Sequence, residues 1–147
     1  MKRFIVLLSA FLVTSIAVAQ VPTITPASDV MAQVIAEASQ QGWLQISPET
    51  AMNQIDAIDP FVIDVRNQNE WDEKGYIPGA MLIPVTELAT NVDALPGDVN
   101  EPIIVYCAKG TRGNYALLYL KSLGYANVKN LSGGFTAWVD AGLPVAN

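Results

Sequence analysis

Two short apolar runs constrain the fold of this chain more than any other feature of its sequence. They are "FVIDV" at 61–65 and "PIIVY" at 102–106, and each is followed by a polar or glycine-containing segment. A compact apolar run of this length indicates a strand buried on both faces, as the strands of parallel sheets are. The fold therefore needs a layer of helices on each side of these strands.

The segments around these two runs alternate between strand and helix patterns. Further strand candidates are "WLQIS" at 43–47, "AMLIP" at 80–84 and "NVKNL" at 127–131. Helical patterns cover 28–41, a segment opened by Ser47-Pro48, 113–123 and 133–142, and one or two helical turns are expected over 86–91. Ser28 and Ser47 are the candidate N-caps. The alternation predicts an α/β fold: a single domain with a central, mostly parallel sheet and helices on both faces.

The first 19 residues have the three-part layout of a secretory signal peptide. Lys2 and Arg3 form a positive start, residues 4–13 are almost wholly apolar, and Ala17-Val18-Ala19 has the small-x-small form of a cleavage site. We expect cleavage after Ala19 and export to a bacterial periplasm or outside the cell, with no membrane span left. The chain would then divide into the signal peptide at 1–19, a leader and helix at 20–43, and the folded domain at 44–147.

Charge and composition exclude several classes of function. The chain has 8 basic and 14 acidic residues, and removal of Lys2 and Arg3 would leave the mature protein with a net charge of −8. Such a protein repels nucleic acid phosphates. The chain has no histidine, which excludes a Ser-His-Asp triad, a Cys-His pair and an ordinary zinc site. We therefore expect no metal and no nucleic acid partner.

Cys107 is the only cysteine, so an internal disulfide is excluded. An unpaired cysteine in an exported protein can form a disulfide with a partner protein, act as a reactive thiol, or be an inert buried side chain. Cys107 directly follows the strand "PIIVY", and in parallel sheets ligands bind beyond the carboxyl ends of the strands. Its position therefore favours a role in chemistry.

The segment after Cys107 has the composition of an anion site. Gly110 and Gly113 let the backbone turn its amides inward, a helix start attracts negative charge, and Lys109 and Arg112 add two cations. The same surroundings favour the thiolate form of a cysteine, which is a nucleophile that needs no histidine as general base. We expect Cys107 to be reactive.

Four motifs in this order resemble the rhodanese-like domain family of sulfurtransferases. They are "VIDVRNQNEW" at 62–71, "GYIPGAMLIP" at 75–84, "IIVYCAKGTRG" at 103–113 and "LGYANVKNLSGGFTAW" at 123–138, and the resemblance spans roughly residues 44–145. It implies that Cys107 takes sulfane sulfur from thiosulfate, a polysulfide or a persulfide, holds it as a persulfide, and passes it to cyanide or a thiol without a cofactor.

The resemblance also implies roles for the residues that follow Cys107. The amides of Ala108, Lys109, Gly110, Thr111, Arg112 and Gly113 would cradle the persulfide and the anionic donor. Lys109 and Arg112 would neutralise the charge of donor and product, and the Thr111 hydroxyl would hydrogen-bond the donor.

Loop length separates this chain from phosphatases and arsenate reductases that share the fold. Those enzymes place the arginine six positions after the cysteine, whereas Arg112 is five positions after Cys107. The smaller ring suits a sulfur atom. Three positions depart from the family pattern: Tyr76 stands in place of a histidine, Gly113 in place of a serine or alanine, and Ala108 in place of a frequent arginine. The loss of that arginine predicts that thiosulfate is a poor donor unless Lys109 compensates.

Asp64 lies within the "FVIDV" run, and Arg66 and Glu70 follow it. We expect these three residues to brace the cysteine loop through an Arg66–Glu70 ion pair. Phe135 and Trp138 are expected in the core, with Gly133-Gly134 forming a sharp turn.

Two alternatives stay open. One is a non-catalytic or redox module of this fold that holds a partner protein; the other, which loop length disfavours, is a phosphatase or arsenate reductase.

Overall fold

The computed structural model describes residues 26–38 and 44–147. The predicted signal peptide and its cleavage site therefore lie outside the described residues. The α-helices are α1 (Ala27–Ala38), α2 (Pro48–Ile58), α3 (Gln68–Lys74), α4 (Thr111–Ser122) and α5 (Gly134–Asp140); the strands are β1 (Gln45–Ile46), β2 (Phe61–Asp64), β3 (Met81–Leu82), β4 (Ile103–Tyr106) and β5 (Val128–Leu131); two 3₁₀ turns are η1 (Leu88–Thr90) and η2 (Val92–Ala94). None of the described helices is long and apolar enough to cross a membrane.

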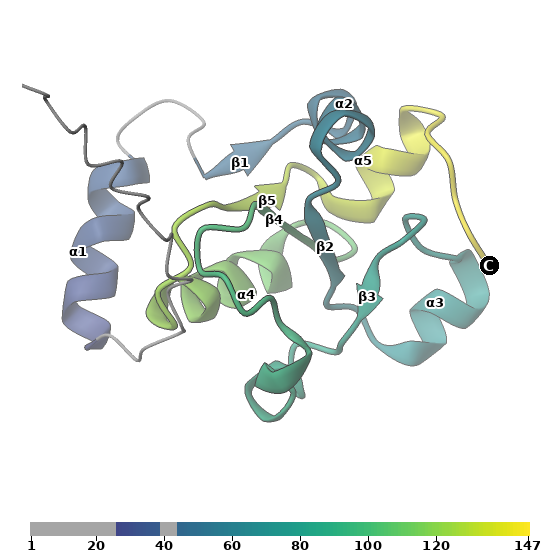
Figure 1. The fold of residues 1–147 in the computed structure, drawn as a ribbon. Coiled ribbons are helices and arrows are strands. Elements are labelled where there is room, and N and C mark those ends of the chain that lie inside the picture. The colour runs from purple at the N-terminus through teal and green to yellow at the C-terminus, as the bar shows by residue number, and fades with distance from the viewer. Residues whose placement is uncertain (1–25, 39–43) are drawn as a thin grey trace, which may run out of the picture.

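The five strands form one sheet in the order β1-β5-β4-β2-β3, and every pair in it is parallel. The two apolar runs become β2 and β4, which lie side by side with Asp64 opposite Tyr106. Figure 1 shows this sheet between its helices. The predicted α/β fold is confirmed.

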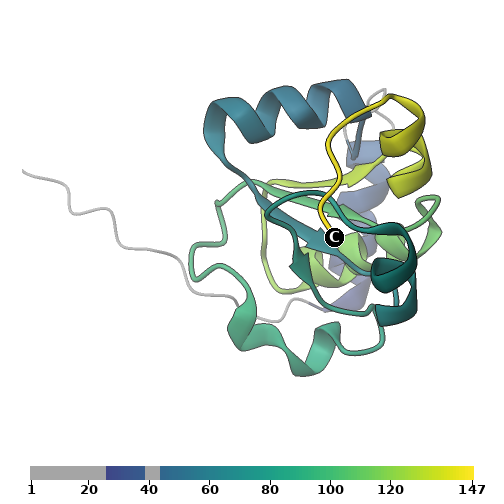
Figure 2. The same ribbon diagram turned by 90° about the vertical axis from the view of Figure 1, so that its right-hand side faces the viewer.

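The core lies on both faces of the sheet because side chains alternate along each strand. Ile63 of β2 and Val105 of β4 join the cluster under α4, whereas Val62 and Ile104 join the cluster under α2 and α5. Figure 2 shows α2 and α5 together on one side of the sheet. Burial on both faces explains why the two runs are apolar at every position except Asp64, which is itself buried.

The predicted N-cap of α2 is confirmed, whereas the structure differs from the sequence patterns at the start of α1 and in the segment of α3. Ser47 caps α2, because its Oγ accepts a hydrogen bond from the Thr50 amide at 3.2 Å and Pro48 follows it. The proposed cap at Ser28 is wrong, since α1 already begins at Ala27. Helix α3 was not expected in its polar segment; its sequence signal is Asn67 and Glu70, since the Glu70 carboxylate accepts from the Asn67 amide at 3.0 Å.

Helix α1 precedes the segment that resembles the family, and it packs against α4 (Figure 1). Lys121 of α4 is buried there, and its Nζ lies 3.0 Å from a Glu37 carboxylate oxygen and donates to the Ala126 carbonyl at 2.7 Å. The sequence leaves open whether 21–43 packs on the domain as a helix or serves as an exchange arm of a dimer. In the described part, α1 is a helix packed on its own domain.

Phe135 and Trp138 are core residues, as expected. Trp138 is 0 % exposed, and its indole N–H donates to the Pro144 carbonyl at 2.8 Å. Phe135 is 4 % exposed and lies in the same cluster.

We expect Trp138→Ala to lower the free energy of unfolding by about 3–5 kcal/mol, because it empties a fully buried indole site. Urea denaturation followed by circular dichroism measures this. Val139→Ala is the matched control on the same helix, since Val139 is 46 % exposed, and it should change stability by less than about 1 kcal/mol. Equal losses in the two variants would contradict the assignment of Trp138 to the core.

Candidate active site

Cys107 lies at the carboxyl end of β4, in the first position after the strand. The side chain is 2 % exposed, and its Sγ accepts a hydrogen bond from the Gly110 amide at 3.1 Å. Gly110 has a φ of +104°, which other residues rarely adopt, and it is the N-cap residue of α4 (Thr111–Ser122). The loop therefore curls around the sulfur, with a backbone amide directed at it.

The loop continues directly into α4, which begins at Thr111. Lys109 and Thr111 are exposed, Ala108 and Arg112 are half-buried, and Gly110 and Gly113 are buried. All six residues expected to cradle the persulfide thus lie on one short turn around Cys107. The structure brings them together, and their binding roles stay predictions.

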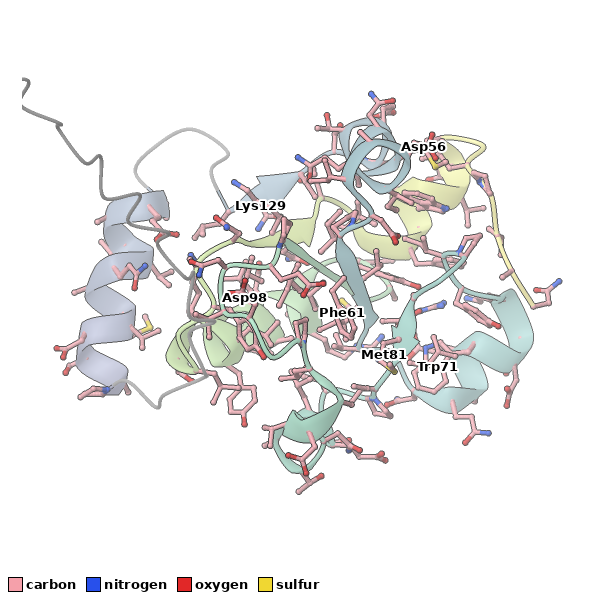
Figure 3. The ribbon with its side chains drawn as sticks, viewed as in Figure 1. Asp56, Phe61, Trp71, Met81, Asp98 and Lys129 are labelled. Atoms are coloured by element: carbon pink, nitrogen blue, oxygen red, sulfur yellow. The ribbon has the colours of Figure 1, made fainter. Side chains whose placement is uncertain are left out.

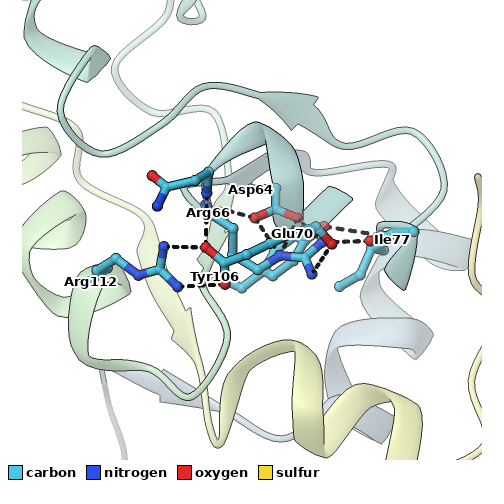
Figure 4. Close-up of polar contacts among 8 residues, drawn as sticks. Asp64, Arg66, Glu70, Ile77, Tyr106 and Arg112 are labelled. Carbon is cyan, nitrogen blue, oxygen red and sulfur yellow. Dashed lines mark hydrogen bonds and ion pairs between the residues drawn. The ribbon is translucent and has the colours of Figure 1, made fainter. Parts of the chain in front are cut away.

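The ion pair at the loop differs from the one expected. Glu70 pairs with Arg112, at 2.6 and 2.8 Å, so that both guanidinium NH groups meet both carboxylate oxygens (Figure 4). The expected Arg66–Glu70 ion pair is wrong, because Arg66 reaches only the backbone carbonyl of Glu70, at 3.4 Å. Helix α3, absent from the sequence prediction, is what carries the Glu70 side chain to the loop.

This ion pair shifts the pKa of both of its partners. The hydrogen bonds from Arg112 lower the pKa of Glu70 from 4.5 to about 2. The pKa of Arg112 is raised, mainly by its hydrogen bonds to Glu70 and to a smaller extent by Cys107. Arg112 is therefore a cation whose charge is already balanced by a carboxylate.

Arg66 instead pairs with Asp64, and both side chains are almost wholly buried. The guanidinium donates to the Asp64 carboxylate at 2.6 Å and to the Gly75 carbonyl at 2.7 Å, and it lies 3.9 Å from the centre of the Phe135 ring. A buried charge needs such complete pairing. The pair ties β2 to the end of α3 and to α5, so its contact with the cysteine loop is indirect.

Helix α5 supports the loop from the other side through its backbone. The amides of Phe135 and Thr136 donate to the carbonyls of Cys107 and Ala108, at 2.8 and 3.0 Å. Gly134 has a φ of +60°, and a Cβ added there would lie 2.2 Å from the Cys107 carbonyl oxygen. The sharp Gly133-Gly134 turn expected from the sequence is confirmed, and it also permits this close approach.

Sequence reasoning missed three polar side chains near the loop: Asn130, Asn114 and Tyr106. Asn130 of β5 is 1 % exposed, and its amide nitrogen donates to the Gly110 carbonyl at 2.9 Å and to the Asn114 side chain at 2.7 Å. Its Oδ1 lies 2.2 Å from where a Gly113 Cβ would stand, which explains the glycine at that position. The Tyr106 hydroxyl accepts from the Ile77 amide at 2.9 Å, and burial raises the pKa of Tyr106. A polar residue inside an apolar strand pattern is the signal that could have found Asn130.

Trp71, which is labelled on α3 in Figure 3, is neither core nor part of this site. It lines a separate cleft of about 600 Å³ together with Tyr76 and Leu82. Across the described residues, no group of three or more Cys, Asp or Glu side chains is arranged to hold a metal ion.

Comparison with known proteins places these features in one family. A sequence model of the family described as "Rhodanese-like domain" matches residues 47–141. A protein named "Sulfurtransferase" from Allochromatium vinosum is 34% identical over 90 residues, which is 61% of this chain and 81% of that protein. A human thiosulfate:glutathione sulfurtransferase is 31% identical over 54% of this chain and 78% of its own length. A rhodanese-related protein from Thermoplasma volcanium has a similar structure, with a TM-score of 0.62 and 30% identity over 69% of this chain and 96% of that one.

Glu70→Gln should make the protein less stable near neutral pH and less sensitive to acid. Because the folded pKa of Glu70, about 2, lies below its ordinary 4.5, the ion pair stabilises the fold above pH 4.5 and loses this effect as the pH falls toward 2. We expect a loss of about 1–2 kcal/mol at pH 6, shrinking below pH 4.5. Urea denaturation over a pH series measures it, with Glu73→Gln on the exposed side of α3 as the control. A loss that stays constant from pH 6 to pH 2.5 would contradict the pairing.

Gly134→Ala and Gly79→Ala separate backbone strain from the clash with the loop. Both glycines have positive φ values, +60° and +80°, but nothing lies within 4 Å of a Cβ at Gly79. Each substitution should cost about 1–2 kcal/mol of strain, and Gly134→Ala about 1–3 kcal/mol more through the Cys107 carbonyl. Thermal or urea unfolding compares them, and equal losses would argue against the close approach of α5.

Proposed function

This chain belongs to the rhodanese-like domain family, and we propose that it is a sulfurtransferase that carries sulfane sulfur on Cys107. The observation that carries the proposal is the position of the Cys107 sulfur at the carboxyl end of β4, with the Gly110 amide directed at it. Sulfurtransferase relatives at 31–34% identity support the reaction class.

In the first step, the Cys107 thiolate attacks the outer sulfur of an anionic donor. With thiosulfate, a new S–S bond forms to Cys107 while the S–S bond of the donor breaks and its electron pair leaves with sulfite. The product is a Cys107 persulfide anion, so one negative charge stays on the loop. The backbone amides at Gly110 and at the start of α4 would stabilise that charge, as amides do in an oxyanion site.

In the second step, the persulfide gives up its outer sulfur. Cyanide attacks that sulfur and leaves as thiocyanate, or a thiolate attacks it and leaves as a new persulfide. In both cases the S–S bond to Cys107 breaks and its electron pair returns to the cysteine as the thiolate. The cycle balances without an oxidant or a cofactor.

The two cations of the loop would have different roles. Arg112 is held by Glu70 at 2.6 Å and so contributes shape more than net charge. Lys109 is exposed and has no ion-pair partner among the described residues. Lys109 would therefore be the cation that meets an incoming anionic donor, with the exposed Thr111 hydroxyl beside it.

The phosphatase or arsenate reductase alternative remains disfavoured. A phosphoryl group needs an arginine free to bind its oxygens in a bidentate manner, and Arg112 is bidentate to Glu70 instead. A binding or redox module is the other alternative, and a Cys107-dependent mixed disulfide with a partner would be its mark.

We further propose that the protein works outside the cytoplasm. The layout of residues 1–19 supports a signal peptide cleaved after Ala19 and a periplasmic or secreted location. Sequencing the N-terminus of the protein recovered from a bacterial periplasm would test this proposal.

Intact mass spectrometry tests the sulfur carrier. After incubation with thiosulfate, or separately with polysulfide, we expect the protein to gain the mass of one sulfur atom and to lose it again on addition of cyanide. Cys107→Ser is the control and should gain nothing. No gain with either donor would contradict the proposed enzyme and would favour the partner-binding alternative.

A further inference from the structure

Asn130 is a buried polar side chain to which the sulfur chemistry above gives no role. It is 1 % exposed and stands on β5 opposite Val105 of the neighbouring strand β4. Residues paired across two strands point to the same face of the sheet, and Val105 shares a core cluster with Cys107. The Asn130 side chain therefore approaches the cysteine loop from the sheet, on the face where the cysteine lies.

Two hydrogen bonds fix the orientation of the Asn130 amide. Its Nδ2 donates to the Gly110 carbonyl at 2.9 Å and to Oδ1 of Asn114, on α4, at 2.7 Å. The same Asn114 oxygen also accepts from Nε2 of Gln45 at 3.1 Å, so it is an acceptor toward both of these neighbours. Turning the Asn130 amide around would place its oxygen against two other oxygens. Its nitrogen is therefore held toward Gly110.

The oxygen of the Asn130 amide has no hydrogen-bond partner among the described residues. It lies 2.2 Å from where a Cβ of Gly113 would stand, so it occupies room that only a glycine leaves. A buried polar atom without a partner is unfavourable, and an apolar side chain of the same shape would avoid this cost. Packing alone therefore does not account for an asparagine at this position, whereas its donor toward Gly110 does.

Gly110 connects this donor to the sulfur. Its carbonyl accepts from Asn130, and its own N–H donates to the Cys107 Sγ at 3.1 Å. Because glycine has wide conformational freedom, a bond that holds the Gly110 carbonyl also limits how its N–H can turn. The Asn114 amide donates to the same carbonyl at 3.0 Å, but that bond comes from α4 itself. Asn130 adds the tie between this residue and the sheet.

We propose that Asn130 is a positioning residue for sulfur transfer, which holds Gly110 so that the N–H of Gly110 stabilises the Cys107 thiolate. Asn130 acts through Gly110 and not on the sulfur directly. The inference rests on the proposed nucleophilic role of Cys107, and it names a residue outside the loop on which the reactivity of that thiolate depends.

The rate at which iodoacetamide alkylates Cys107 in the full-length protein, followed by intact mass over a pH series, tests this role. Asn130→Leu keeps the approximate shape of the side chain and removes the donor. We expect alkylation about three- to tenfold slower at about pH 7, because a weakened hydrogen bond leaves less thiolate. Above about pH 10 the difference should disappear, because the thiol is then ionised in both proteins.

The Asn130→Leu protein is expected to fold, because both acceptors of the lost hydrogen bonds keep another donor. The Gly110 carbonyl keeps the Asn114 amide, and the Asn114 side chain keeps Gln45. Asn114→Ala is the second variant, at an exposed position. It removes the acceptor that orients the Asn130 amide, and it should slow alkylation about twofold at about pH 7.

Asn127→Leu is the matched control. The Asn127 amide also donates to a backbone carbonyl, that of Asn100 at 2.8 Å, but it lies at the other end of β5. This variant should react like the wild type at every pH. All of these variants keep the charged groups of the loop and of the elements that hold it, which are Lys109, Arg112, Glu70, Asp64 and Arg66.

The outcomes separate this inference from the proposed function. Alkylation of Asn130→Leu at the wild-type rate over the whole pH series would overturn the role of Asn130. A rate lowered by the same factor at about pH 7 and at about pH 10 would also overturn it, because access to the sulfur and not the thiolate would then have changed. If Asn130→Leu does not fold, a wild-type profile of Asn114→Ala overturns the inference. Failure of the wild type to load sulfur would overturn the proposed function, while the alkylation rates would still decide the role of Asn130.

Discussion

The approach of α5 to the cysteine loop is the constraint on which the rest of the site depends. Two amides at the start of this helix donate to the carbonyls of Cys107 and Ala108, and only a glycine at position 134 leaves room for that contact. On its opposite side the loop is held by Glu70 through Arg112. Because the loop is held on both sides, the Gly110 amide stays directed at the Cys107 sulfur.

The charges of the site are arranged so that few are free. Arg66 and Arg112 each meet a carboxylate, and among the described ion pairs the buried Asp64–Arg66 pair has the lowest exposure at both ends. This leaves Lys109 as the exposed cation of the loop, in a chain whose formal net charge is −6. In such an acidic protein, an exposed cation beside inward-turned amides would favour the binding of a small anion at the cysteine loop.

The part of the chain before the family domain is joined to it by a buried contact. Lys121 on α4 is 4 % exposed and is satisfied by Glu37 of α1 and by the Ala126 carbonyl. A buried ammonium that lost its carboxylate partner would be costly. Helix α1 is thus energetically coupled to α4, the helix whose first turn follows the cysteine loop.

The sequence by itself determined the sheet, its parallel strands and the position of Cys107 at a strand end, because continuous apolar runs, glycines and helix caps act locally. It also predicted the core roles of Phe135 and Trp138 and the Gly133-Gly134 turn. Only the tertiary structure decided that Glu70 pairs with Arg112 rather than Arg66, since residues 42 positions apart meet only when α3 forms and packs beside the loop. The hydrogen bond from Asn130 to the Gly110 carbonyl was likewise decided by the tertiary structure. A polar residue in an apolar strand pattern marks Asn130, but its partner lies 20 positions away in the sequence.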